Sequence, residues 1–436
     1  MEVNAARVPS GPGQPYRIAE DLLEWMGRQF CNFGDTYKAT VYGASTYVTK
    51  NPDFAYHVLV ENWQNYIKGQ MIQRVALLLG NGLMVSEGEL WKRQRRMIQP
   101  AFSHDSIAAV AKLITIVNSQ LLRKWQLAAE KNESINVTRD VSSMAMEVVL
   151  RFIFGVDYER VGSRFNLLSD ETARNMDFAR LFRPLRQIIL ELINERRTGR
   201  VVACSYPDAL STLICAADPK SGAPMADQQI VDEAVTLIVA GHETTASTLN
   251  WTWYLLSQHA EVEQKLSAEL EVTNFSDTND LPAFPYTRQI IEEAMRLYPA
   301  GWLVTRKALR DDRLGDFFVP AGTEIYIPLY FIQRHPELWA EPDRFDPDRF
   351  RPGGSTNRHR LATIPFSVGP RNCIGSIFAR VEMQIHLLII AKHLRLRYAE
   401  SKPVQLDAGV NLRSKSDFIM YPGRKVNVKS TLVTSD

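Results

Sequence analysis

Hydrophobic residues recur at helical spacing through most of the first 300 positions of this 436-residue chain. The spacing predicts a helix over 21–33, a second starting at Pro52, and mainly helices from about residue 88 to residue 298. A loop rich in Pro and Gly near 219–224 precedes the long helix expected from about Asp227. Another apolar, helix-forming run extends from Ile374 to about Leu394. Most of the chain is therefore expected to be helical.

Strand-like patterns are short and lie toward the two ends of the chain. Aromatic and β-branched residues at 37–42 and 46–48, with Gly43 between them, predict a hairpin. Residues 317–328 and 404–431 have the pattern of further short strands. We therefore expect a mainly α protein with small β-sheets.

The region 336–372 contains many Pro, Asp and Arg and shows little periodicity. A long irregular stretch inside a compact domain is uncommon and often functional. No internal repeat stands out, and the length suits one large core. We expect one domain over 1–436, with a β-rich N-terminal lobe at roughly 1–60 and a helical body over 61–436.

Composition narrows the classes of function. The formal net charge is +2, so nothing in it implies attraction to nucleic acid. The four cysteines are scattered without Cys-x-x-Cys spacing, which argues against a disulfide framework or a zinc ribbon and favours a reducing, cytoplasmic compartment. No apolar run approaches the ~18 residues that a membrane span needs, so we expect none.

One cysteine stands in an unusual setting, Phe366-Ser-Val-Gly-Pro-Arg-Asn-Cys373-Ile-Gly375. A thiolate needs positive charge or donors, and a Gly-rich turn at a helix N-terminus supplies them. The two glycines let the backbone approach something flat and large. Cys373 is then either a metal ligand below a planar cofactor, with haem the natural candidate, or a small buried hydrophobe.

This stretch resembles the Phe-x-x-Gly-x-Arg-x-Cys-x-Gly signature of the cytochrome P450 family. The resemblance implies the P450 fold, haem b as cofactor with Cys373 as the iron ligand and Phe366 and Gly375 beside it, and a monooxygenase that uses dioxygen. Because membrane-anchored members begin with a hydrophobic helix, its absence here suggests a bacterial-type protein.

A second motif is Ala240-Gly-His-Glu243-Thr244-Thr245, within the long helix. Ala240 and Thr244 are four apart and share a face, while Gly241 and the threonines permit a local bulge. A hydroxyl beside a carboxylate can relay protons, although a solvated helix turn is the plain alternative. The motif resembles the oxygen-binding helix of the family, which implies that Ala240 lies against the haem and that Glu243 and Thr244 are the acid–alcohol pair.

Two further patterns match the family. Trp91 and Arg95 lie four apart on a basic helix, and the resemblance implies that they hold the haem propionates together with Arg306 and Arg371. Glu293 and Arg296 share a helix face and resemble the family's Glu-x-x-Arg pair, for which Arg349 would be the third member. Neither pattern would be specific alone.

The expected walls of the substrate pocket are apolar or aromatic. Apolar candidates for the pocket wall are Leu237, Trp302, Val304 and Phe418, which fit a medium-sized apolar or aromatic molecule that is hydroxylated, coupled or cyclised, in secondary or lipid metabolism. The segment between Gly155 and Glu195, which normally roofs the pocket, is short for the family, either truly or because a mobile loop is missing.

No phosphate loop or dinucleotide fingerprint is present in the sequence, so electrons are expected from a separate ferredoxin or flavodoxin with its reductase. Lys92, Arg93, Arg96 and Arg371 are candidates for its docking face. A peroxide-driven enzyme and a haem-binding sensor or carrier are the alternatives.

Overall fold

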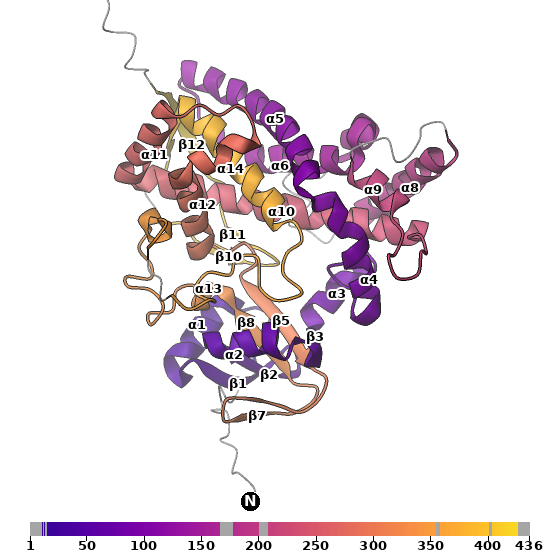
Figure 1. Ribbon diagram of the computed structural model, residues 1–436. Coiled ribbons are helices and arrows are strands. Elements are labelled where there is room, and N and C mark those ends of the chain that lie inside the picture. Colours follow the sequence, from indigo (N-terminus) through magenta and orange to yellow (C-terminus); the bar gives the residue numbers. More distant parts are fainter. Residues whose placement is uncertain are drawn as a thin grey trace, which may run out of the picture.

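A long helix, α10 (Asp227–Gln258), crosses the molecule, and most other helices pack around it (Figure 1). The structure is a computed structural model that describes residues 11, 13, 15–165, 178–199, 208–354, 358–400 and 403–425. The other α-helices longer than four residues are α1 Leu22–Phe33, α2 Pro52–Tyr56, α3 Gln70–Leu79, α4 Gly88–Ile98, α5 His104–Glu130, α6 Val137–Phe154, α7 Tyr158–Phe165, α8 Phe178–Arg197, α9 Ala209–Cys215, α11 Ala260–Val272, α12 Pro285–Leu297 and α14 Ser376–His393.

The helices begin and end where local chemistry favours it. Asp21 caps α1 by accepting the backbone N–H of Glu24 at 3.0 Å, and Asn51 caps α2 just before Pro52. The helix predicted from Pro52 continues as one wider turn over His57–Glu61. These boundaries agree with the sequence pattern.

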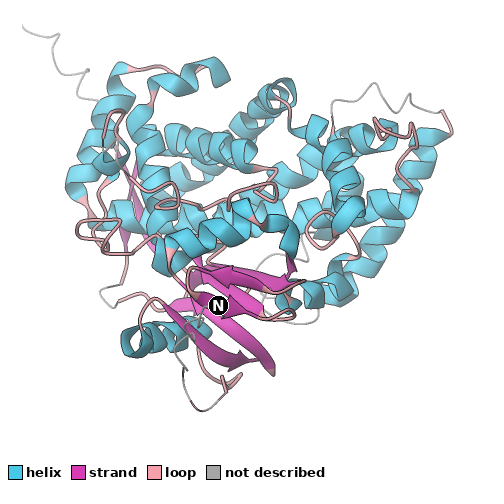
Figure 2. Cartoon of the chain, turned by 60° about the horizontal axis from the view of Figure 1, so that its bottom comes forward, coloured by secondary structure: helices cyan, strands magenta, loops and turns pink. Residues whose placement is uncertain are grey.

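The strands gather mainly at one side of the molecule (Figure 2). They are β1 Thr36–Val41, β2 Ala44–Thr49, β3 Tyr66–Lys68, β4 Ile135–Asn136, β5 Leu303–Ala308, β6 Asp312–Leu314, β7 Phe317–Val319, β8 Glu324–Pro328, β9 Leu394–Tyr398, β10 Leu406–Ala408, β11 Leu412–Ser414 and β12 Ile419–Arg424. The largest sheet has the order β1-β2-β8-β5-β3, and only its β2–β8 pair is parallel. A mainly α fold with small sheets is therefore confirmed.

The N-terminal strands do not form a lobe by themselves. β1 and β2 pair with each other, and β2 then pairs with β8, which lies far along the chain. The sheet thus draws strands from 303–328 as well, so the boundary expected near residue 60 does not separate a β-rich lobe from the helical body.

Helix α6 lies directly against α10, and Gly241 makes this contact possible. A Cβ at Gly241 would lie 2.9 Å from Cγ2 of Val149. α10 is helical without interruption through this position. The bulge expected at Gly241 is therefore not present, and the missing side chain serves helix packing instead.

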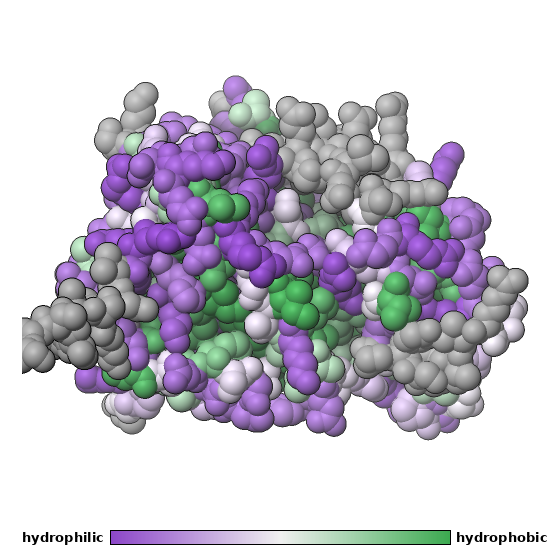
Figure 3. Space-filling view, turned by 90° about the horizontal axis from the view of Figure 1, so that it is seen from above, coloured by the Kyte–Doolittle hydropathy of each residue, from purple (hydrophilic) through white to green (hydrophobic). Residues whose placement is uncertain are grey.

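Helix α5 is the one helix, among the described residues, whose length and hydropathy would allow it to cross a membrane. It packs along α6 and α14, and Ile114 and Trp125 on it are fully buried. The face of the molecule seen from above shows separate hydrophobic patches between hydrophilic residues (Figure 3).

The cysteines differ from the expectation in one respect. Cys31 and Cys373 are free, whereas Cys215, at the end of α9, is disulfide-bonded.

Of the short segment expected to roof a pocket, α7 and α8 are described, and residues 166–177 between them lie outside the described residues.

Candidate functional site

The loop before α14 is a tight turn that carries Cys373 to the start of that helix. The backbone N–H of Cys373 donates to the carbonyl of Phe366 at 2.9 Å, and that of Asn372 donates to Gly369 at 3.1 Å. Gly369 has a φ of +75°, and a Cβ there would lie 2.2 Å from the carbonyl oxygen of Leu59. The nearest neighbour on the Cβ side of Gly369 is thus the Leu59 backbone, and the approach of Gly369 to a cofactor stays a prediction.

The thiol of Cys373 is accessible on one side and surrounded by protein atoms elsewhere. Desolvation raises its pKa, and the backbone N–H of Gly375 and the guanidinium groups of Arg95 and Arg380 lower it without reversing that direction. A thiolate at this position therefore needs further positive charge. A metal cation at Sγ would supply it, which fits the ligand role that the resemblance implies.

Helix α4 fixes the Cys373 loop from one side. Arg95 donates to the carbonyl oxygen of Asn372 at 2.6 Å and to its Oδ1 at 2.9 Å. Trp91, one turn earlier, is buried against Trp63, with ring centroids 5.8 Å apart. Both side chains expected at a haem edge thus lie near the loop, but Arg95 is engaged in holding it.

Three cations gather around one carboxylate beside this loop. Arg371 forms an ion pair with Glu87. Lys68 and Arg306 lie directly opposite each other in the antiparallel β3–β5 pair. The pKa of Lys68 is lowered to about 7, mainly by burial; the charges of Arg371 and Arg306 act in the same direction, while Glu87 and Glu233 oppose it. Burial and Arg371 lower the pKa of Arg306 to about 10.

This arrangement has the charge expected of a site for an acidic ligand. Like charges opposite each other in a sheet are destabilising, and Nε of Arg371 is buried without a hydrogen-bond partner. The two carboxylates of a haem would compensate the excess of positive charge. Lys68 could not be predicted from its local sequence, because only the β3–β5 register brings it opposite Arg306.

One face of α10 carries the residues expected near bound oxygen. Ala240 is exposed in a helix whose residues from 230 to 238 are buried. Leu237, three positions earlier, is 9% exposed. The hydroxyl of Thr244 donates to the carbonyl of Ala240 at 2.8 Å, as Ser and Thr often do inside helices. The structure therefore brings these three residues onto one face, as the spacing predicts.

Glu243 is held from outside the helix. Its Oε2 accepts from Nδ2 of Asn411 at 2.9 Å, and its Oε1 accepts from Nη1 of Arg413 at 3.3 Å. Between the described side chains, no hydrogen bond joins Glu243 to Thr244. Sequence reasoning had no signal for Asn411 or Arg413, which lie about 170 residues later.

A buried ionic network anchors the irregular segment before the Cys373 loop. Glu293 and Arg296 are both fully buried and share two hydrogen bonds, of 2.6 and 2.8 Å. Nε of Arg349 lies 3.4 Å from Glu293, and Arg349 also donates to the carbonyls of Ala340 and Glu341. Burial raises the pKa of Glu293, and Arg296 opposes this. The three residues predicted to meet do so.

Two residues predicted to line a substrate pocket belong to the core instead. Trp302 is 2% exposed and donates through Nε1 to the carbonyl of Gly409 at 3.0 Å. Phe418 is 1% exposed and packs against Trp251 and Tyr254. Both assignments are therefore corrected. Val304, in β5, stays partly buried.

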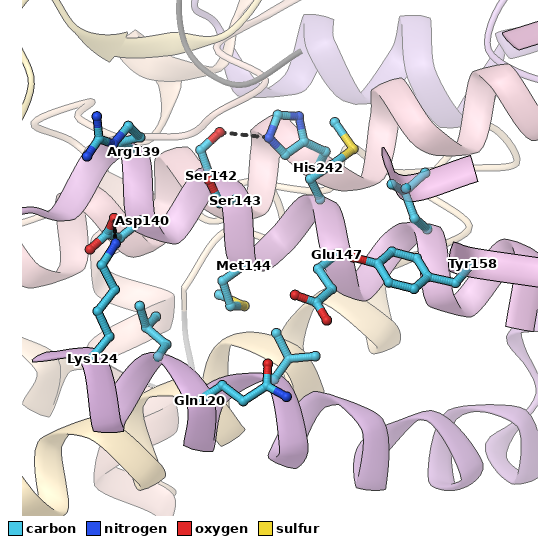
Figure 4. Close-up of a pocket in the computed structure, with 15 residues that line it drawn as sticks. Gln120, Lys124, Arg139, Asp140, Ser142, Ser143, Met144, Glu147, Tyr158 and His242 are labelled. Atoms are coloured by element: carbon cyan, nitrogen blue, oxygen red, sulfur yellow. Dashed lines mark hydrogen bonds and ion pairs between the residues drawn. The ribbon is translucent and has the colours of Figure 1, made fainter. Parts of the chain in front are cut away.

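A pocket of about 490 Å³ opens elsewhere, among α5, α6, α7 and α10 (Figure 4). His242 reaches it from α10 and shares a hydrogen bond of 2.8 Å with Ser142. Burial lowers the pKa of His242 to about 4. Cys373, Ala240 and Thr244 are not among the lining residues, so this pocket lies behind α10 and is separate from the Cys373 site.

The sequence matches a model of the family described as "Cytochrome P450" over residues 16–184 and 163–419. It is 34% identical over 388 residues to cyclooctat-9-en-7-ol 5-monooxygenase of Streptomyces melanosporofaciens, covering 84% of this chain and 83% of the relative. Identity to pentalenene oxygenase of Streptomyces avermitilis is 29% over 399 residues, covering 86% and 87%.

Solved structures agree with the fold. The retinoic acid-bound cyanobacterial CYP120A1 superposes with a TM-score of 0.86 at 21% identity, covering 97% of this chain and all of that one. The heme domain of cytochrome P450DA gives a TM-score of 0.84 at 22% identity, covering 97% and 98%. At these identities the likeness establishes the architecture.

Proposed function

Because this chain belongs to the cytochrome P450 family, we propose that it oxidises a cyclic terpenoid or a similar medium-sized apolar molecule. The family establishes the broader activity: the chain is a haem-dependent monooxygenase that takes a small-molecule substrate, dioxygen and electrons from a donor protein. The observation that carries the proposed site is Cys373 at the start of α14, with a cationic cluster beside it.

Haem supplies the iron at which oxygen is activated, and this chain's residues hold it. Cys373 would be the thiolate ligand, with Phe366 and Gly375 shaping its loop. Arg306, Arg371 and Lys68 would neutralise the propionates, which relieves the repulsion between these cations. Trp91 and Arg95 complete this side by fixing the loop. The network of Glu293, Arg296 and Arg349 would keep the loop in place.

Proton delivery is proposed to run along α10. The carboxyl of Glu243 would donate a proton toward the hydroxyl of Thr244, which passes it to the oxygen side of the pocket. Ala240 has a small side chain, so this part of the helix leaves room for dioxygen and substrate. The acid–alcohol pair also argues against a peroxide-driven enzyme or a haem-binding carrier, neither of which needs a proton relay.

The substrate class rests on the pocket wall and on the relatives. Leu237 and Ala240 are apolar, and nothing charged lies between them on their helix face. The Streptomyces relatives are named for a cyclic alkenol and for pentalenene. We therefore propose that this chain hydroxylates such a ring system, or couples or cyclises it, in bacterial secondary metabolism. A cytoplasmic location stays a prediction.

The electron donor is proposed to be a ferredoxin or flavodoxin served by its own reductase. Lys92 pairs with Glu89 at 2.7 Å, with 41% of its side chain exposed, and remains a candidate for the docking face. Arg96 forms an ion pair with Asp218 at 3.0 Å, and Arg93 donates to the carbonyl of Pro224. Arg371 is turned inward with its side chain 9% exposed, so it is removed from that face.

The test is the absorption spectrum of the reduced, carbon monoxide-bound protein, beside Cys373→Ser and the matched variant Cys31→Ser. We expect the strongly red-shifted Soret band of a thiolate ligand in the wild type and in Cys31→Ser, and its loss in Cys373→Ser. A cyclic terpenoid alcohol added to the ferric protein should then shift the spectrum saturably. If the Soret band of the reduced, carbon monoxide-bound wild type lacked this red shift, the assignment of Cys373 as the thiolate ligand would be contradicted.

A further inference from the structure

Arg380, on α14, brings a positive charge to the Cys373 loop across an aromatic ring. Its Cζ lies 4.5 Å from the centroid of the Phe366 ring. The carbonyl of Phe366 accepts the backbone N–H of Cys373 at 2.9 Å. In the described part of the chain, the side-chain hydrogen bonds of Arg380 go only to Glu292. Arg380 therefore reaches the loop through ring contact and charge.

Glu292, on α12, holds this guanidinium in place. Nε of Arg380 donates to Oε1 of Glu292 at 2.6 Å, and Nη2 donates to Oε2 at 3.5 Å. The side chains of Arg380 and Glu292 are 37% and 15% exposed, so solvent and salt screen the pair only in part. A carboxylate from α12 and a ring from the loop thus fix where the positive charge lies.

The other cation near Cys373 has a different task. Arg95 donates two hydrogen bonds to Asn372, so replacing it would alter the loop itself. Burial raises the pKa of Cys373, and the guanidinium groups of Arg95 and Arg380 act against this. Because the hydrogen bonds of Arg380 go to Glu292, its charge can be changed while the hydrogen bonds of the loop stay intact.

The two charges of this pair have opposite effects on a redox centre at Cys373. An electron taken up there adds negative charge, which a fixed cation stabilises and a fixed anion destabilises. The surroundings of an axial ligand are among the means by which a protein sets the potential of a bound haem. Arg380 therefore favours the reduced form, and Glu292 opposes it from a greater depth in the protein.

We propose that Arg380 and Glu292 are positioning residues that together set the reduction potential of haem bound at Cys373, with Arg380 raising it and Glu292 moderating the rise. The pair thereby adjusts how readily the chain accepts an electron from its donor. This inference rests on the role of Cys373 as the haem ligand given under "Proposed function".

The test is a spectroelectrochemical titration of the haem-loaded protein with small redox mediators and no donor protein. Wild type is compared with Arg380→Gln, Arg380→Lys, Glu292→Gln and the double variant of Arg380→Gln with Glu292→Gln. Arg397→Gln is the matched control, since it removes one positive charge from an exposed arginine in β9, beyond the far end of α14, that stacks on Tyr421.

We expect Arg380→Gln to lower the ratio of reduced to oxidised haem about tenfold at a fixed potential, which is about 59 mV for one electron. Glu292→Gln should raise the ratio about threefold, because its amide oxygen still accepts from Arg380 while its charge is gone. The double variant should lie between these two, Arg380→Lys should recover most of the ratio, and Arg397→Gln should match wild type.

The opposite signs separate an electrostatic role from a structural one. If the bridge only held α12 against α14, Arg380→Gln and Glu292→Gln would change the ratio in the same direction, and that result would overturn the proposal. So would a wild-type ratio in Arg380→Gln. If Arg380→Gln fails to retain haem, Glu292→Gln decides, and an unchanged or lowered ratio in it would equally overturn the role of the pair.

Two additional measurements on the same samples identify which assumption fails. A reduced, carbon monoxide-bound wild type without the red-shifted Soret band would reject Cys373 as the ligand, and this inference with it. If the band is present, the potentials do not move and reduction by a ferredoxin slows in Arg380→Gln, then Arg380 contacts the donor instead, and the proposed control of the potential is wrong.

Discussion

Replacing Arg296 with methionine should be among the most damaging single changes in this chain. The substitution keeps most of the side-chain volume but removes the cation that pairs with Glu293, and both residues are fully buried. Breaking a buried ion pair from one side costs about 3–5 kcal/mol, because the remaining charge stays buried. Arg349, at 3.4 Å, compensates Glu293 only in part.

The guanidinium of Arg296 also serves backbone carbonyls. It donates to those of Gln333 and Pro342 at 2.9 and 2.7 Å and to that of Arg344 at 3.2 Å. Leaving a buried acceptor without a donor costs about 1–3 kcal/mol, though these terms overlap with the charge term. We therefore expect a loss of about 4 kcal/mol in the free energy of unfolding, which is roughly a thousandfold in the unfolding equilibrium.

The same substitution should weaken haem retention. Gln333, whose carbonyl Arg296 binds, accepts the backbone N–H of Ile364 at 2.7 Å, and Ile364 lies just before the Cys373 loop. Loss of Arg296 therefore reaches that loop through one intermediate residue. The assay is guanidinium unfolding followed by far-ultraviolet circular dichroism, with the Soret-to-protein absorbance ratio as the measure of bound haem.

Two comparisons make this prediction specific. Arg344→Met removes a mostly exposed arginine that pairs with Glu341 on the same segment, and should cost less than about 0.5 kcal/mol. Replacing Glu293 with leucine together with Arg296→Met removes both charges, and should be less destabilising than Arg296→Met by about 1–2 kcal/mol. A loss below about 1 kcal/mol in Arg296→Met would refute the reasoning.

Two further predictions concern the loop and the cationic cluster. Gly369→Ala should destabilise the fold by at least about 2 kcal/mol and lower haem occupancy, because it combines a φ of +75° with a Cβ 2.2 Å from the Leu59 oxygen. The control in the same unfolding assay is Gly353→Ala, which is also at positive φ but has open space around its Cβ position. Lys68 should give the haem-free protein an unfolding free energy that rises between about pH 7 and pH 10.5, because in that range the unfolded state binds a proton at this residue that the folded state has lost. Lys68→Met should flatten that slope relative to Lys38→Met, measured by denaturation across pH, and an unchanged slope would mean that Lys68 is not desolvated as described.

The helices could be predicted from the sequence, because the spacing of apolar residues and the capping residues depend only on nearby positions. Helical spacing from Asp227 and the apolar run after Cys373 mark α10 and α14 within two residues of where they begin. The partners of the strands were not predictable in the same way. The pairing of β2 with β8 joins segments that no short-range pattern connects. The predicted β-rich N-terminal lobe therefore lacked the strands from 303–328.

The residues of the candidate site also differ in whether the local sequence could predict them. Cys373, Ala240 and Thr244 belong to contiguous motifs, so the sequence around each of them is enough to mark it. Lys68, Asn411 and Arg413 reach the site only through strand register and hairpin docking, and their local sequence is ordinary. Trp302 and Phe418 show the converse error, since an aromatic residue near a motif suits a pocket wall and a core equally well.

The parallel pairing of β2 with β8 also affects how the protein folds while it is synthesised on the ribosome. Thr46 pairs with Glu324, so the two partners are separated by 324 − 46 = 278 residues. At a synthesis rate of 5–20 residues per second, β2 waits about 14–56 s for its neighbour while its edge stays unpaired. Contacts this distant also slow the search for the native topology. The β1–β2 hairpin of the nascent chain is therefore the segment that we expect chaperones to shield until β8 has left the exit tunnel.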